Sequence, residues 1–92
     1  SIDGLGLLLA SQQEMMLATP PKVSIRNVTG AGDALMAGMA YGFARGMDLR
    51  EIARLGAAFS AVAVTTESLA SVKNSDVEAM LPRVEVRTVN VM

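Results

Sequence analysis

Asp33 is the residue whose type and position most clearly allow chemistry. It stands directly after Gly30-Ala31-Gly32 and directly before an apolar stretch that predicts a helix. Glycines allow a tight turn and let a bulky anion approach the main chain closely. The first amides of a helix have no intrahelical acceptor, and the helix dipole adds partial positive charge there. The segment therefore predicts a phosphate-binding site with one carboxylate beside it.

Two roles for the Asp33 carboxylate compete. As a helix N-cap it would accept hydrogen bonds from the amides of Leu35 or Met36, which is worth about 1 kcal/mol. As a general base it would take a proton from a hydroxyl group that attacks the bound phosphate. Capping alone does not account for glycines on both sides of Ala31. The segment is not a Walker A loop, because the Lys and Ser/Thr are missing, and it lacks the third glycine of a dinucleotide fingerprint.

Composition excludes several other kinds of function. The 92 residues contain no cysteine and no histidine, so thiolate chemistry, disulfides and triads that need His are excluded for this chain. The net charge of −1, with no run of like charges, argues against a nucleic-acid surface or a polybasic membrane patch. The apolar runs are too short for a membrane span. We therefore expect a soluble, cytoplasmic protein with no nucleic-acid or membrane partner.

The elements predicted around Asp33 are strands before it and mainly helices after it. The long helix after Asp48 carries no charge from Gly56 to Thr66, so both its faces there must be covered by protein or by ligand. Gly38 and Gly42 lie on one helix face and predict close approach by another backbone. The pattern predicts strands over 5–10, 14–18, 23–26 and 84–91. It predicts a buried helix over 34–45 capped by Gly46, and a second helix from Asp48 to about Thr65, with Glu51 completing a capping box. A last short helix is expected to start at Ser75 with Glu78 and to end at Pro82.

The stretch "NVTGAGDALMAG" resembles the C-terminal signature of the ribokinase-like (PfkB) carbohydrate kinases. "PPKVSIRNVTGAGD", "RGMDLREIARLGAAFSAVAVTTES" and "SIDGLGLLLA" also resemble the family's neighbouring segments, so the likeness covers most of the chain. It corresponds only to the last third or so of a family-length protein. The resemblance implies that residues 1–92 are the C-terminal part of a single kinase domain, an α/β/α three-layer sandwich with a mostly parallel sheet. Such a part, lacking the sugar-binding portion, is expected to be inactive alone.

The resemblance also implies an activity, which is transfer of the γ-phosphoryl group of ATP, with Mg²⁺, to a hydroxymethyl group of a sugar or nucleoside. It implies that Asp33 is the catalytic base. It places Gly30, Ala31 and Gly32 in an anion hole. It places Gly6, Gly56, Ala57 and Ser60 in the nucleotide site, and Asn27 and Thr29 at a monovalent-cation site. Plain helix packing remains an equal alternative for Gly56, Ala57 and Ser60.

Three departures from the family pattern bear on these expectations. Asn27 stands where the family usually has Asp, which leaves dependence on K⁺ open. Asp3 replaces the first Gly of the nucleotide-contacting turn, and Ser68 replaces a Gly that is common in the loop after the long helix. The segments "GAGDALMAG" and "RGMDLREIARLGAAFSAVAVTTES" resemble pseudouridine kinase-like members of the family most. The segment "PPKVSIRNVTGAGD" resembles the 1-phosphofructokinase and tagatose-6-phosphate kinase branch to the same degree. A pseudouridine-like acceptor is the weakly favoured expectation.

Two further classes of function stay open at this point. A non-catalytic nucleotide- or anion-binding module would share the amide cradle without needing Asp33, and a purely structural domain would need neither. A homodimer of the full-length protein is also an open expectation.

Overall fold

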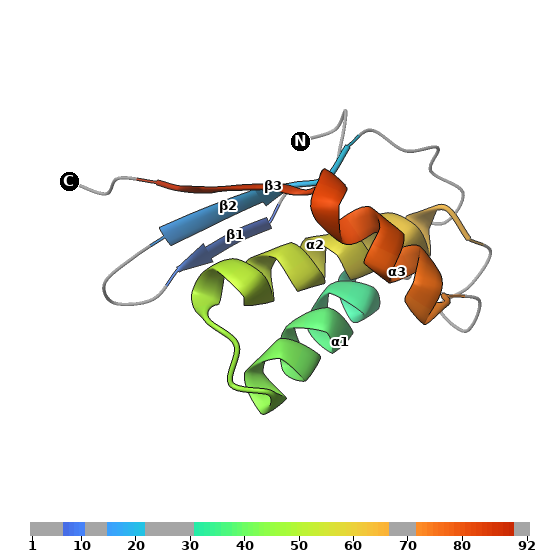
Figure 1. Ribbon diagram of the computed structural model, residues 1–92, viewed down its shortest axis with the longest axis horizontal. Coiled ribbons are helices and arrows are strands. Elements are labelled where there is room, and N and C mark those ends of the chain that lie inside the picture. Colours follow the sequence, from blue (N-terminus) through green and yellow to red (C-terminus); the bar gives the residue numbers. More distant parts are fainter. Residues whose placement is uncertain (1–6, 11–14, 22–30, 67–71, 90–92) are drawn as a thin grey trace.

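The computed structural model describes residues 7–10, 15–21, 31–66 and 72–89. Along these segments two strands precede the helices and a third strand follows them. Figure 1 shows the helices gathered on one side of a small sheet. The elements in chain order are β1 (Leu7–Ala10), β2 (Met15–Thr19), α1 (Ala31–Ala44), α2 (Leu49–Val64), α3 (Asn74–Met80), the 3₁₀ turn η2 (Leu81–Arg83) and β3 (Glu85–Thr88).

The described strands form a sheet in the order β1-β2-β3, and both pairings are antiparallel. Leu8 pairs with Leu17 between β1 and β2, and Met16 pairs with Thr88 between β2 and β3. Only residues 11–14 join β1 to β2, which is too short for the crossover that parallel strands require. The expected hairpin and the strand near the C-terminus are confirmed. The expected mostly parallel sheet is not found among these strands, and the strand predicted over 23–26 lies outside the described residues.

Helix α2 packs across all three strands and forms the centre of the molecule. Its small residues Ala53, Ala58 and Ala61 have no exposed surface, so the helix approaches the sheet closely over Met16 and Ala18. Asp48 is the N-cap, and its Oδ1 accepts a hydrogen bond from the Glu51 amide at 2.8 Å. The uncharged stretch from residue 56 to 64 is buried except at Phe59, which is half-buried. The prediction that both faces of this stretch are covered, by protein or by ligand, is confirmed for residues 56–64, and here protein covers them.

Helix α1 packs against α2 and lies farther from the sheet than α2 does (Figure 1). It begins at Ala31, three residues earlier than expected. The prediction of a helix buried on nearly all sides is wrong, because Met36, Tyr41 and Phe43 are 66%, 44% and 60% exposed. Only the face that meets α2 is buried. Gly46 ends the helix with φ at +70°, which confirms its expected role as a C-terminal cap.

The short helix α3 packs on α2 and brings Val77 and Met80 into the core. Its N-cap is Lys73, without a side-chain capping bond, so the expectation that Ser75 starts the helix is wrong. Pro82 lies inside η2, which continues the chain for one turn past α3. Proline is tolerated there because the first residues of a helical turn need no backbone donor.

Candidate active site

The N-terminus of α1 is open to solvent. Ala31 is half-buried, Gly32 is exposed, and a Cβ placed on Gly32 would meet no atom within 4 Å. The amides of this first turn have no intrahelical acceptor and carry the positive end of the helix dipole. A phosphate group can therefore approach the main chain at Gly32 without displacing a side chain.

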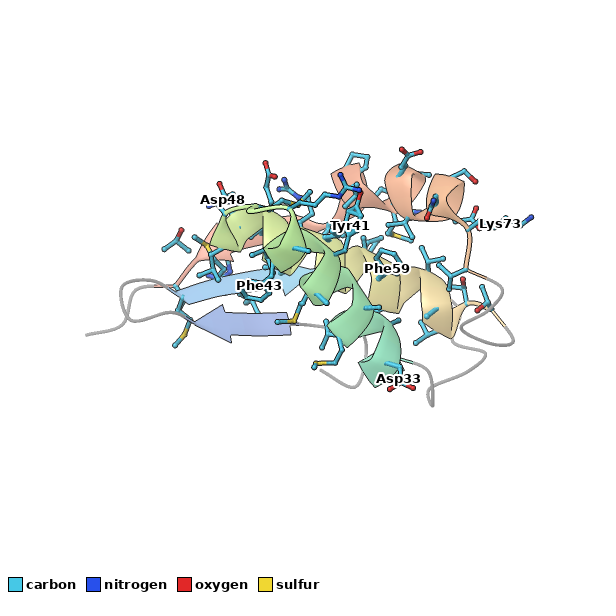
Figure 2. The ribbon with its side chains drawn as sticks, turned by 90° about the horizontal axis from the view of Figure 1, so that it is seen from below. Asp33, Tyr41, Phe43, Asp48, Phe59 and Lys73 are labelled. Atoms are coloured by element: carbon cyan, nitrogen blue, oxygen red, sulfur yellow. The ribbon has the colours of Figure 1, made fainter. Side chains whose placement is uncertain are left out.

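Asp33 is the third residue of α1 and is exposed. Figure 2 shows its side chain at the end of the helix, pointing away from the ribbon. An N-cap residue stands immediately before the first residue of a helix, whereas Asp33 lies inside α1. The interpretation of Asp33 as the N-cap is therefore wrong. Within the described part of the chain, no hydrogen bond joins the carboxylate to the amides of Leu35 or Met36. The carboxylate is therefore available to a ligand bound at the same helix end.

Close contact between α1 and α2 holds this helix end in place. Ala34 has no exposed surface, and a Cβ on Gly38 would lie 2.9 Å from the Leu55 carbonyl oxygen and 3.0 Å from the Gly56 Cα. Only glycine allows this approach of two backbones. The predicted close approach at Gly38 is confirmed, and a similar contact brings Gly42 against Ile52. The first turn of α1 is thus carried on a closely packed pair of helices, which favours preorganised binding.

The predicted nucleotide-site residues of α2 are all buried. Gly56 faces Gly38 of α1, and Ala57 and Ser60 are 3% and 7% exposed. The contact at Gly56 accounts for that glycine by packing alone, and a nucleotide-binding role for the three residues stays a prediction. The remaining predicted site residues, Gly6, Asn27, Thr29 and Gly30, lie outside the described residues.

Among the described residues of this helix end, Asp33 carries the carboxylate that could bind a metal ion. In the described segments no three metal-binding side chains form a cluster. A separate finding is that none of the described helices is long and apolar enough to cross a membrane. Mg²⁺ commonly binds through one or two carboxylates together with substrate phosphates and water. The single exposed carboxylate of Asp33 beside an open helix end is compatible with this mode of Mg²⁺ binding.

A cavity of about 430 Å³ lies away from this site, near the opposite end of α1. Met47, Leu55, Leu81 and Pro82 form its apolar wall, and Glu51 and Arg54 add charge. The Arg54 Nε is buried and has no hydrogen-bond partner among the described residues. Arg54 is not among the predicted site residues, although its spacing of three residues from Glu51 on one helix is a signal visible in the sequence. None of the predicted site residues that the structure describes lines this cavity.

An open helix N-terminus on a scaffold of strands and helices suits the binding of phosphate groups. A family model described as pfkB family carbohydrate kinase matches residues 3–76. The chain therefore belongs to the pfkB family of carbohydrate kinases.

Relatives with known names agree with this assignment. The 1-phosphofructokinase of Rhodobacter capsulatus is 46% identical over 55 residues, which is 60% of this chain and 17% of the relative. The 1-phosphofructokinase of Bacillus subtilis (strain 168) is 33% identical over 86 residues, which is 94% of this chain and 28% of the relative. The chain thus spans less than a third of the length of these relatives.

Solved structures match the fold over most of the chain. A carbohydrate kinase from Agrobacterium tumefaciens, 30% identical, matches with a TM-score of 0.72 over 94% of this chain and 29% of its own. A structure from Staphylococcus aureus, 22% identical, matches with a TM-score of 0.88 over 98% of this chain and 29% of its own, which shows the fold alone. The mixed helix and strand arrangement is therefore that of part of a ribokinase-like kinase.

Proposed function

We propose that this chain is the C-terminal part of a single PfkB kinase domain that phosphorylates a sugar phosphate with ATP. The observation that carries the proposal is the open N-terminus of α1 with Asp33 exposed in its first turn. In the complete domain, helices would cover both faces of a larger, mostly parallel sheet, to which the three described strands would contribute one antiparallel portion.

The reaction assigns one task to each group at this helix end. The acceptor hydroxyl attacks the γ-phosphorus while Asp33 takes its proton, a new P–O bond forms, and the bond to the bridging oxygen of ADP breaks. The amides of Ala31 and Gly32, with the unplaced Gly30, would donate hydrogen bonds to the equatorial oxygens. Phosphoryl transfer asks a protein mainly for such positioning and charge stabilisation. Mg²⁺, when bound, would neutralise charge on the β- and γ-phosphate oxygens.

The acceptor that we propose is fructose 1-phosphate, phosphorylated on its remaining primary hydroxymethyl group. The named relatives of this chain are 1-phosphofructokinases. These matches favour the sugar-phosphate branch over the pseudouridine kinase-like acceptor that the sequence analysis favoured. That earlier preference came from alanine-rich helical segments, and the buried small residues of α2 account for those segments by packing alone.

The test is a substrate panel on the full-length protein that carries this chain. With ATP and Mg²⁺, ADP release is measured in a coupled assay with fructose 1-phosphate, tagatose 6-phosphate, fructose and pseudouridine. The proposal predicts the highest kcat/KM for fructose 1-phosphate. A higher value for pseudouridine would refute the acceptor assignment.

The same panel separates the other classes of function. No turnover with any acceptor, but binding of ATP detected by calorimetry, would support a non-catalytic nucleotide-binding module. Absence of both turnover and heat of ATP binding would support a purely structural domain.

A further inference from the structure

The cavity lined by Arg54 has no part in the proposed kinase chemistry. It lies at the corner between α1 and α2, where Met47 lines it and the Met47 amide donates a hydrogen bond to the Gly42 carbonyl oxygen at 3.0 Å. Asp33 stands in the first turn of α1, so the length of the helix separates the two places by roughly 15 Å. A small ligand in this cavity therefore leaves the proposed phosphate site free.

The Arg54 side chain supplies an unused hydrogen-bond donor in this cavity. Its Nε is buried and has no hydrogen-bond partner among the described residues. Glu51 also lines the cavity and is exposed, but in the described part of the chain the two side chains form no ion pair. A buried N–H without an acceptor is costly and rare in folded proteins. A bound oxyanion that accepts a hydrogen bond from Nε removes this cost.

The rest of the cavity wall is apolar, and it is formed by Met47, Leu55, Leu81 and Pro82. A second cavity of about 310 Å³ shares three of these residues, so the two hollows adjoin. Tyr41 of α1 and Phe59 of α2 also line the second cavity (Figure 2). Cavities of about 300–1,000 Å³ with mostly apolar walls and a few polar groups are typical of small-molecule sites. The wall therefore suits a ligand with an apolar body.

The charges in the cavity indicate which oxyanion fits. A guanidinium group matches a planar carboxylate with two parallel hydrogen bonds, and Nε–H can be one of the two donors. A phosphate monoester carries nearly two negative charges at neutral pH, whereas a carboxylate carries one. Arg54 offers one positive charge, and Glu51 beside it repels an anion more strongly as the charge of that anion grows. The pair therefore favours a carboxylate over a phosphate.

We propose that this cavity is a binding site for a small monocarboxylate with an apolar chain. The carboxylate would accept hydrogen bonds from Arg54, and the chain would lie along the apolar wall toward the second cavity. The site is separate from the α1 N-terminus, so this inference does not rest on the proposed function.

The test measures binding of octanoate to the full-length protein that carries this chain, by isothermal titration calorimetry. Butanoate should bind about tenfold or more weakly, because its shorter chain buries fewer methylene groups. Octanol, which lacks the charge, and octyl phosphate, which carries more of it, should each bind about tenfold or more weakly than octanoate. Absence of octanoate binding at about 5 mM would overturn the proposal, as would octanol or octyl phosphate binding as tightly as octanoate.

A matched pair of substitutions tests the role of Arg54. Arg54→Gln removes the guanidinium from the cavity, and Arg87→Gln makes the same change at an exposed position of β3 that does not line it. Arg54→Gln should weaken octanoate binding about tenfold or more, and Arg87→Gln should leave it nearly unchanged. Equal affinities of the two variants would reject the site. Melting temperatures report whether both variants fold, and if Arg54→Gln does not, the comparison of head groups on the unsubstituted protein decides.

The position of the ligand is read from methionine methyl resonances of the same protein in ¹³C NMR spectra. Met47 lines the cavity, whereas Met36 lies on α1 away from it and serves as the reference. Octanoate should shift the Met47 resonance and leave Met36 in place. A shift at Met36 without one at Met47 would place the ligand elsewhere and refute the assignment. Octanoate binding by a protein without kinase turnover would uphold this site and remove only the proposed function.

Discussion

The contact between α1 and α2 at Gly38 makes a prediction that can be worked from distances. In Gly38→Ala the new Cβ would lie 2.9 Å from the Leu55 carbonyl oxygen, 3.0 Å from the Gly56 Cα and 3.1 Å from Phe59 Cδ2. Optimal carbon contacts lie near 3.5–4.0 Å, so α1 must move roughly 0.5–1 Å away from α2. Two of the three close atoms are backbone atoms, which cannot rotate aside. Overpacking of this kind costs about 1–3 kcal/mol.

A second substitution in the same helix isolates this cost. In Gly32→Ala the new Cβ meets nothing within 4 Å. Both substitutions gain the helix preference of alanine over glycine, about 1 kcal/mol, so this gain largely cancels in the comparison. The free energy of unfolding, from urea titration followed by circular dichroism, should therefore be about 1–3 kcal/mol lower for Gly38→Ala than for Gly32→Ala. Equal stability of the two variants would refute the close packing of the two helices.

Three further predictions concern the elements that hold α1 and α2 in position, each measured by urea unfolding. Asp48→Ala removes the cap on the Glu51 amide and should lower the free energy of unfolding by about 1 kcal/mol; no change would show that the cap contributes nothing. Gly46→Ala forces alanine to a φ of +70° and should cost about 1–2 kcal/mol; a stabilised variant would contradict the left-handed cap. Arg50→Met removes the 2.7 Å hydrogen bond to the Val86 carbonyl oxygen that joins α2 to β3, with an expected cost of about 1.5 kcal/mol; an unchanged midpoint would show that this bond is not formed in solution.

The helices of this chain could be predicted from local signals, and their surroundings could not. The Asp48 cap, the Gly46 stop and the spacing of Gly38 and Gly42 each depend on residues within one turn or one helix face. The exposed side of α1 depends on which other elements are present, so apolar composition alone wrongly indicated burial. The start of α3 was misplaced because a capping pattern at Ser75 was given weight that the observed N-cap, Lys73, does not support.

In the sheet and the candidate site, too, local features could be predicted from the sequence, and features that depend on distant residues could not. The hairpin was predictable because a short polar turn separates two apolar runs, whereas the pairing of β2 with β3 joins segments about seventy residues apart and leaves no local signal. For the site, the glycines and Asp33 predicted an open helix end. Whether Asp33 would cap the helix depended on the residue at which α1 begins. The family resemblance indicated the phosphotransferase class. For the acceptor, the helical segments favoured a pseudouridine-like molecule, whereas the 1-phosphofructokinase relatives support the sugar-phosphate alternative that the segment before Asp33 also indicated.

The central claim is that Asp33 deprotonates an acceptor hydroxyl beside a phosphate held by the amides of α1. The most direct test measures kcat and the ATP dissociation constant of the full-length protein with and without Asp33→Asn. The account predicts that kcat falls by about two to four orders of magnitude, as expected on loss of a general base, while ATP affinity stays nearly unchanged. Retention of most of the turnover in Asp33→Asn would contradict it.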